Sequence, residues 1–189
     1  DFVLEEKVSP EIIKKYKGKV NETVLEVWKR YGFGTILNGY LRFVNPDKYE
    51  EIMEDTTGKF ESAIVVFTTA MGDMIVWEKN RSFIILNYRR GGIIGVPQKT
   101  FFLDLEEGGN ETYQENFDWN PYPEAIKKYG KPAYDECFGY FPVLGAGGVE
   151  KVENLKKVKL TEYIYANTAV TGDLCKWLNF SMEVNEQRN

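Results

Sequence analysis

The stretch that decides the fold is Ser62-Ala-Ile-Val-Val-Phe-Thr68, followed by Met74-Ile-Val-Trp-Glu78 and Ser82-Phe-Ile-Ile-Leu-Asn-Tyr88. Each run is short, apolar and rich in β-branched or aromatic residues, which is typical of strands. The links Met71-Gly72-Asp73 and Lys79-Asn80-Arg81 supply residues that suit tight turns. We therefore predict an antiparallel meander here. Because the runs do not alternate cleanly between apolar and polar residues, we expect this sheet to be covered on much of both faces.

Helix signals precede the meander. Ser9-Pro10-Glu11 and Asn45-Pro46-Asp47 each join a capping residue, a proline and an acid, which is the usual chemistry of a helix start. Asn21 caps a further helix that carries Trp28. We interpret Trp28 as a core residue rather than a ligand-stacking one, because aromatic residues at helical spacing usually face the core. Tyr40-Leu-Arg-Phe-Val44 alternates as a strand does.

Similar signals follow the meander. We expect a strand at Thr100-Phe-Phe-Leu103, and either an edge strand or a solvated connector at 149–160. Helices are predicted from Pro121 to Tyr129 and from Thr161 to about Val170. The tail at 180–189 has little to bury and should fray. This order of elements predicts an α+β fold with a central, mainly antiparallel β-sheet and flanking helices.

Composition narrows the class of protein. The chain has 189 residues, of which 43% are hydrophobic, and this suffices for one α+β domain over 1–189. Lys and Arg total 24 against 29 Asp and Glu, a net charge of −5 that disfavours direct binding to nucleic acid. No apolar stretch approaches the roughly 18 residues of a membrane span. We expect a soluble, cytoplasmic protein that does not bind membranes; because the chain begins with Asp1, a removed leader stays possible.

The chain contains no histidine and only two cysteines, Cys137 and Cys175. The absence of histidine removes the commonest general base and the commonest zinc ligand. We therefore predict no structural zinc site, no cofactor and no disulfide. Carboxylate-only catalysis and Mg²⁺ sites stay possible in principle, but no spacing of acids supports them.

Arg89-Arg-Gly-Gly-Ile-Ile-Gly95 could form an anion-binding turn. The segment lacks the spacing of a phosphate-binding loop or a dinucleotide fingerprint, so an ordinary glycine-rich turn is the favoured interpretation.

One segment is strongly biased in charge. It contains no Lys or Arg, and its acids are Asp104, Glu106, Glu107, Glu111, Glu115 and Asp118. Three interpretations are open. It is an ordinary solvated loop, kept extended by repulsion and by Gly108-Gly109; it is a negative patch that attracts a basic partner; or it is a calcium site, although the spacing of a calcium-binding loop is missing. We take the six acids as the candidate partner-binding residues.

Three groups of motifs, in order along the chain, resemble one bacterial immunity-protein family. They are Tyr16-Lys-Gly-Lys-Val20 with Leu25-Glu-Val-Trp-Lys-Arg-Tyr-Gly-Phe-Gly34 and Asn38-Gly-Tyr-Leu-Arg-Phe-Val-Asn-Pro46; then Thr69-Ala-Met-Gly-Asp-Met-Ile-Val-Trp77; then Phe138-Gly-Tyr-Phe-Pro-Val-Leu-Gly-Ala-Gly-Gly148 with Val152-Glu-Asn-Leu155. Its members join a GAD-like N-terminal region to a C-terminal domain of formerly unknown function. The best-known members resemble immunity partners of DNase toxins delivered by type VI secretion, and they are distantly SUKH-like.

The resemblance implies a GAD-like region at about 12–100 and an immunity-type region at about 101–172. It also implies a binding protein, not an enzyme, that neutralises a cognate toxin, here a basic nuclease. The chain departs from the family at Gly145-Ala-Gly-Gly148, where a more apolar segment is usual, and in the acidic insertion between Asp104 and Asp118, so the resemblance does not identify the toxin.

Two other functions compete with this one. The same fold could serve as a SUKH-type regulatory or scaffolding module for cellular proteins. A small-molecule or enzymatic site around Asp73 is the third possibility, although a lone carboxylate in a tight turn is usually structural.

Overall fold

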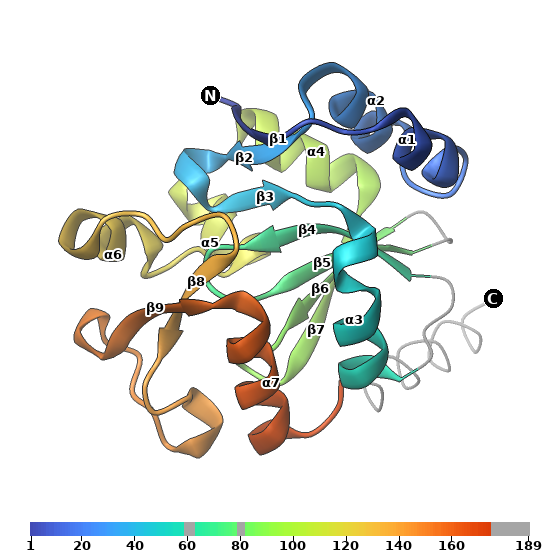
Figure 1. The fold of residues 1–189 in the computed structure, drawn as a ribbon. Coiled ribbons are helices and arrows are strands. Elements are labelled where there is room, and N and C mark those ends of the chain that lie inside the picture. Colours follow the sequence, from blue (N-terminus) through green and yellow to red (C-terminus); the bar gives the residue numbers. More distant parts are fainter. Residues whose placement is uncertain (59–62, 79–81, 175–189) are drawn as a thin grey trace.

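The computed structural model describes residues 1–58, 63–78 and 82–174. Seven strands form one sheet in the order β1-β2-β3-β4-β5-β6-β7, and β8 and β9 form a small second sheet (Figure 1). Every neighbouring pair of strands is antiparallel. The strands are β1 (Val3–Glu6), β2 (Phe33–Ile36), β3 (Leu41–Phe43), β4 (Ala63–Thr69), β5 (Met74–Glu78), β6 (Ser82–Asn87), β7 (Gly92–Pro97), β8 (Glu136–Tyr140) and β9 (Leu155–Lys159). The predicted α+β class and the central meander, β4 to β6, are confirmed.

Helices precede and follow the strands of this sheet along the chain and pack against its faces. They are α1 (Pro10–Tyr16), α2 (Glu22–Tyr31), α3 (Glu50–Thr57), α4 (Gln98–Glu107), α5 (Asn110–Phe117), α6 (Tyr122–Tyr129) and α7 (Leu160–Thr171), with 3-10 turns η1 (Leu37–Gly39), η2 (Pro46–Tyr49), η3 (Leu144–Ala146) and η4 (Val152–Asn154). The helix starts follow the predicted chemistry. Ser9 Oγ accepts a hydrogen bond from the Ile12 amide, and Asn21 Oδ1 accepts from the amides of Thr23 and Val24.

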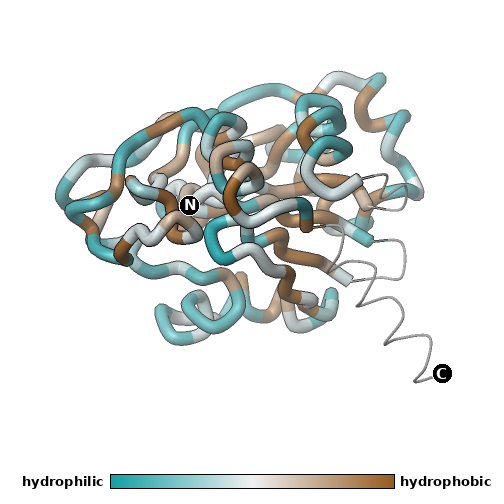
Figure 2. The backbone as a smooth tube through the Cα atoms, turned by 90° about the horizontal axis from the view of Figure 1, so that it is seen from below, coloured by the Kyte–Doolittle hydropathy of each residue, from teal (hydrophilic) through white to brown (hydrophobic). Residues whose placement is uncertain are grey.

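Both faces of the sheet are covered, as the apolar runs predicted. Ile75 of β5 points into a core with Phe101 of α4, whereas Val76 points into a second core with Ile164 of α7. In Figure 1, α3 and α7 lie in front of the sheet, and α4 and α5 lie behind it. Trp28 of α2 is a core residue with only 1% of its surface exposed. Figure 2 shows the hydrophobic stretches gathered in the interior strands and hydrophilic ones along outer turns.

The prediction for Thr100 to Leu103 was wrong. This segment lies inside α4, where Phe101 is buried and stacks on Phe83 with ring centroids 4.0 Å apart. Three apolar residues in a row fit a strand and a helix equally well, and only the partly buried Leu105 farther along the chain distinguishes them. The following acidic segment is likewise not an extended loop, because α5 occupies residues 110–117.

The sequence interpretation also missed strands at the edges of the sheet. Residues 92–97 form β7, although Arg89 to Gly95 was predicted as a glycine-rich turn, and residues 33–36 form β2, where no strand was predicted. Gly34 pairs with Leu4 across β1 and β2, and an added Cβ would lie 2.2 Å from the Val3 carbonyl oxygen. The glycine is therefore needed for close strand approach rather than for a turn. Of the two alternatives for 149–160, its second half forms strand β9.

The first 90 residues and the remainder are joined by buried polar contacts. Arg42 of β3 is 1% exposed, and its Nη1 donates to the carbonyl oxygens of Tyr134 and Glu136. The Tyr40 hydroxyl donates to the Phe117 carbonyl, and the Phe138 amide donates to the Ala70 carbonyl at 2.8 Å. Because such groups are costly to leave unpaired, we propose that both parts fold as one unit.

Within the described residues, no helix is long and apolar enough to cross a membrane. Cys137 is a buried free thiol, and burial raises its pKa to about 12. Cys175, the link at 79–81 and the predicted frayed tail at 180–189 lie outside the described residues.

Candidate functional site

The acidic segment forms a hairpin of two short helices, α4 and α5. Phe101 and Phe117 hold the two helices against the large core with their rings 5.4 Å apart. Asp104 accepts a hydrogen bond from Asn116 Nδ2 at 2.8 Å, which ties one helix to the other. Aromatic packing thus outweighs the charge repulsion that predicted an extended loop.

Four of the six predicted acids lie on the outside of this hairpin. Glu106, Glu107, Glu111 and Glu115 are all exposed, and we call them the acidic surface. None of the ion pairs found in the described part of the chain includes any of them. Exposed acids elsewhere often do have a partner, as Glu153 does in Lys128 at 2.7 Å. The acidic surface therefore presents its full negative charge to the solvent.

The four glutamates of the acidic surface do little to stabilise α4 and α5. Glu106 and Glu107 lie in the last turn of α4, where the helix dipole favours cations by about 0.3–1 kcal/mol per charge. Glu111 suits the first turn of α5, but Glu115 follows it at i+4, and like charges at that spacing cost about 0.2–0.5 kcal/mol. Three of the four charges thus do not stabilise the helices that carry them.

Asp118 differs from these four because its carboxylate is used inside the protein. It is 6% exposed and ends α5 in a left-handed conformation. Its Oδ2 accepts from Asn87 Nδ2 at 3.1 Å and from Arg90 Nε at 2.7 Å. Burial opposes its ionisation, but the hydrogen bonds from Arg90 and the charge of Arg89 outweigh burial and lower the pKa of Asp118. We therefore leave Asp118 and the helix-bridging Asp104 out of the acidic surface.

The arginines of the glycine-rich segment are also occupied by the protein's own carboxylates. Arg89 donates from Nε and Nη2 to Asp73 Oδ2 at 3.0 and 2.6 Å, and both side chains are 1% exposed. Arg90 bridges Asp118 and Glu150. Both arginines of the possible anion-binding turn therefore already pair with carboxylates of the protein. Asp73 lies in a buried ion pair and not at an open site.

Burial acts in opposite senses on the Asp73–Arg89 pair. It raises the pKa of Asp73 although Arg89 opposes this, whereas the charge of Asp73 outweighs burial and raises the pKa of Arg89. We take both groups as ionised, because a guanidinium keeps its proton in proteins and donates twice to the same oxygen. In the described part of the chain, no cluster of three or more acids or cysteines is arranged to hold a metal ion.

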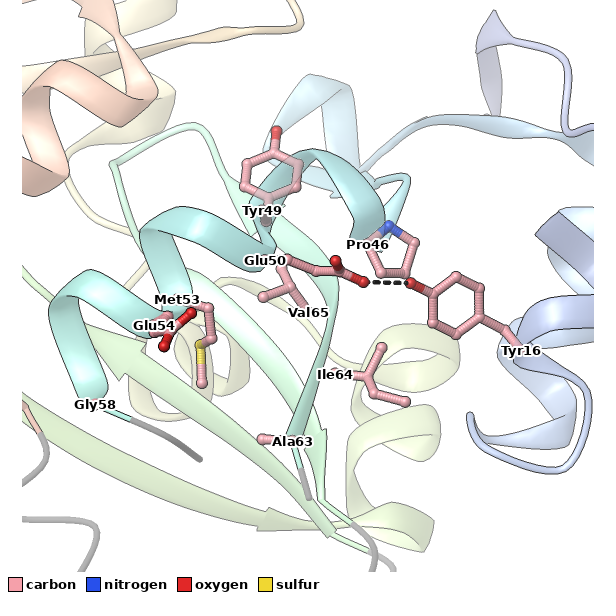
Figure 3. A pocket seen from close by; sticks show the side chains of 10 residues that line it. All are labelled: Tyr16, Pro46, Tyr49, Glu50, Met53, Glu54, Gly58, Ala63, Ile64 and Val65. Atoms are coloured by element: carbon pink, nitrogen blue, oxygen red, sulfur yellow. Dashed lines mark hydrogen bonds between the residues drawn. The ribbon is translucent and has the colours of Figure 1, made fainter. Parts of the chain in front are cut away.

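A pocket of about 440 Å³ was missed by the sequence analysis. It lies between Tyr16 of α1, the α3 region around Met53, and Ile64 of β4 (Figure 3). α3 and β4 follow one another along the chain, but Tyr16 belongs to a much earlier helix, so the sequence does not show that the three meet.

Comparison with known families resolves the class of the chain. The profile of the GAD-like domain matches residues 2–89, and the profile described as T6SS immunity protein Tdi1, C-terminal, matches residues 98–166. In this order the chain matches the GAD-like domain and the C-terminal domain of a type VI secretion immunity protein. The resemblance predicted from the sequence motifs is thereby confirmed, and an immunity role is supported. The acidic surface lies in the Tdi1-type region, and the pocket lies in the GAD-like region.

The fold has a solved relative. The crystal structure of Atu4351 from Agrobacterium tumefaciens superposes with a TM-score of 0.69 at 20% identity, covering 90% of this chain and 85% of that chain. At this identity the similarity bears on the fold alone. A search of curated proteins gave no match.

Proposed function

We propose that this type VI secretion immunity protein binds and neutralises a basic nuclease toxin without catalysing any reaction. The observation that carries the proposal is the acidic surface: four exposed carboxylates, without ion-pair partners in the described part of the chain, on a helical hairpin fixed by buried aromatics. The matches to immunity-type domains support a toxin as the partner. The negative charge of the acidic surface favours a toxin with a basic surface.

The physical basis is competition with the nuclease substrate. A nuclease holds the phosphate backbone with lysine and arginine side chains. Carboxylates offered to that surface take the place of phosphates and attract the toxin over long range, which raises the association rate at low salt. Exposed charges contribute mainly to the association rate, whereas buried anchors set the dissociation rate.

The test replaces Glu106, Glu107, Glu111 and Glu115 with glutamine in one variant. We expect slower association with the toxin encoded beside this chain, and a weaker dependence of the association rate on salt. The midpoint of urea unfolding should stay almost unchanged, because exposed charges contribute little to stability. Surface plasmon resonance across a salt series and rescue of growth on co-expression provide the measurements.

A matched control removes four negative charges elsewhere, at the exposed Glu5, Glu22, Glu124 and Glu162. This control should retain most of the association rate. An unchanged association rate at low salt in the first variant would show that the interface lies elsewhere. If the wild-type protein neither binds the toxin nor rescues growth, and instead captures a cellular protein, the SUKH-type scaffolding function replaces the proposal.

A further inference from the structure

The pocket in the GAD-like region exists because two neighbouring strands differ in length. Strand β3 pairs with β4 only from Phe67 to Thr69, and the Val44 amide adds one bond to the Val66 carbonyl. Beyond this point the chain leaves the sheet at Asn45 and forms η2 and α3. Among the described residues, the first part of β4 therefore has a partner strand on only one side, and α3 lies across the space beside it.

The interior of the pocket is apolar. Met53, with 7% of its surface exposed, and Val65, with 3%, form the inner wall, and the half-buried Ala63 and Ile64 line the β4 side. Figure 3 shows Met53 pointing from α3 toward β4, with Tyr16 closing the opposite end. These groups can bury aliphatic carbons of a ligand.

The rim of the pocket is acidic. Glu50 and Glu54 of α3 are exposed at its edge, and Asp47 lies beside it. Lys15 forms ion pairs with two of these acids, with Asp47 at 2.7 Å and with Glu50 at 3.1 Å. Among the described residues, one cation thus faces three carboxylates at this rim, which leaves an excess of negative charge.

Part of this rim is held in place by hydrogen bonds. The Tyr16 hydroxyl donates to Asp47 Oδ1. It also lies 3.3 Å from Glu50 Oε1, to which it donates (Figure 3). Burial and the bond to Asp47 raise the pKa of Tyr16, so the hydroxyl stays protonated as a donor. Burial opposes ionisation of Asp47, but the hydrogen bonds from Lys15 and Tyr16 lower its pKa. Asp47 is thus ionised, and hydrogen bonds from Tyr16 hold Asp47 and Glu50 in place.

We propose that this pocket receives a lysine or arginine side chain of the toxin, together with an apolar neighbour. Such a side chain buries its aliphatic stem and keeps its charged head at the surface. The apolar wall matches the stem and the acidic rim matches the head, whereas an acidic or purely apolar occupant fits only one of the two. The proposal rests on the proposed function for the identity of the partner, and it adds an anchor that sets the dissociation rate.

The first test uses a chemical probe and needs no toxin. Acetyl-Leu-Arg-amide is titrated into ¹⁵N-labelled protein, and acetyl-Leu-citrulline-amide, its neutral isostere, serves as control. We expect saturable shifts at the amides of Met53, Glu54 and Ile64, and about tenfold weaker binding of the citrulline peptide. Equal binding of both peptides would reduce the site to an apolar pocket, and an absence of shifts at millimolar peptide would overturn the proposal.

The second test uses the neighbouring toxin. Glu54→Gln should raise the dissociation rate about two- to fivefold, as for an exposed ion pair, while Glu22→Gln should not. An unchanged dissociation rate in Glu54→Gln refutes the pocket as the toxin anchor and leaves the proposed function standing. If the wild-type protein fails to bind the toxin, the proposed function fails, and the peptide titration still decides the chemistry of the pocket.

Discussion

Replacing Arg89 with methionine tests whether the buried ion cluster joins the two parts of the chain. Arg89 donates two hydrogen bonds to Asp73 Oδ2 and one, at 3.1 Å, to the Asp118 carbonyl oxygen. Its Nη2 also lies 3.2 Å from Asp118 Oδ2. Methionine fills part of the same volume but leaves the Asp73 carboxylate buried, without its counter-charge.

The expected loss follows from that unpaired charge. Breaking a buried ion pair by removing one partner typically costs about 3–5 kcal/mol. With a urea m-value of about 2 kcal/mol per molar, the midpoint should fall by about 1.5–2.5 M. Adding Asp73→Asn to Arg89→Met removes the stranded charge and should restore about 1–3 kcal/mol.

Urea titrations followed by both tryptophan fluorescence and circular dichroism provide the assay. Lys128→Met is the control, because Lys128 pairs with Glu153 on the surface and its loss should cost no more than about 1 kcal/mol. A cost below about 1 kcal/mol for Arg89→Met, or a double variant no more stable than the single one, would refute the reasoning. Separate transitions in the wild type would refute the proposal that both parts fold as one unit.

Two further predictions concern single residues. Trp28→Ala should lower the free energy of unfolding by about 3–5 kcal/mol, because the indole is 1% exposed and packs edge-on against Tyr16 and Phe33; a loss under 1 kcal/mol would contradict its core role. Asp118→Asn should destabilise the protein at neutral pH and progressively less below about pH 4. The folded pKa of Asp118 lies below its unfolded value of about 3.9, so its stabilisation is present above that value and is lost as the pH falls through the folded pKa. Urea midpoints at pH 7, 5 and 3 measure this, and a pH-independent difference would rule it out.

The central strands and the early helices were predictable because their signals are local. The segments that form β4, β5 and β6 contain more apolar residues in a row than a turn or a solvated segment usually does. The turn between β4 and β5 contains Gly72, whose φ of +91° suits glycine. The edge strands were not predictable in the same way. Strand β1 pairs with β2 across about 30 residues of helical hairpin, and its side chains are largely exposed, so neither apolar content nor spacing marks it.

The candidate site shows the same limit. The excess of acids between residues 104 and 118 was visible in the sequence, but which of them face solvent was not. Asp118 is taken up by Arg89 and Arg90, almost thirty residues earlier in the chain, through a contact that only the folded chain creates. The pocket depends on where β3 stops, which Asn45 and Pro46 signal locally, and on how α3 crosses β4, which no local pattern predicts.

The buried groups that join the two parts of the chain are distinct from the exposed groups proposed to bind the partner. The two parts of the chain are joined by buried groups such as Arg42, Arg89 and Tyr40, whose replacement would disturb both. The acidic surface and the pocket rim lie on exposed faces of helices whose other faces are fixed by aromatic or apolar packing. Substitutions on these exposed faces cost little stability. We therefore expect charge changes on the acidic surface and the pocket rim to alter binding to a basic partner while leaving the buried contacts, and with them the stability of the chain, almost unchanged.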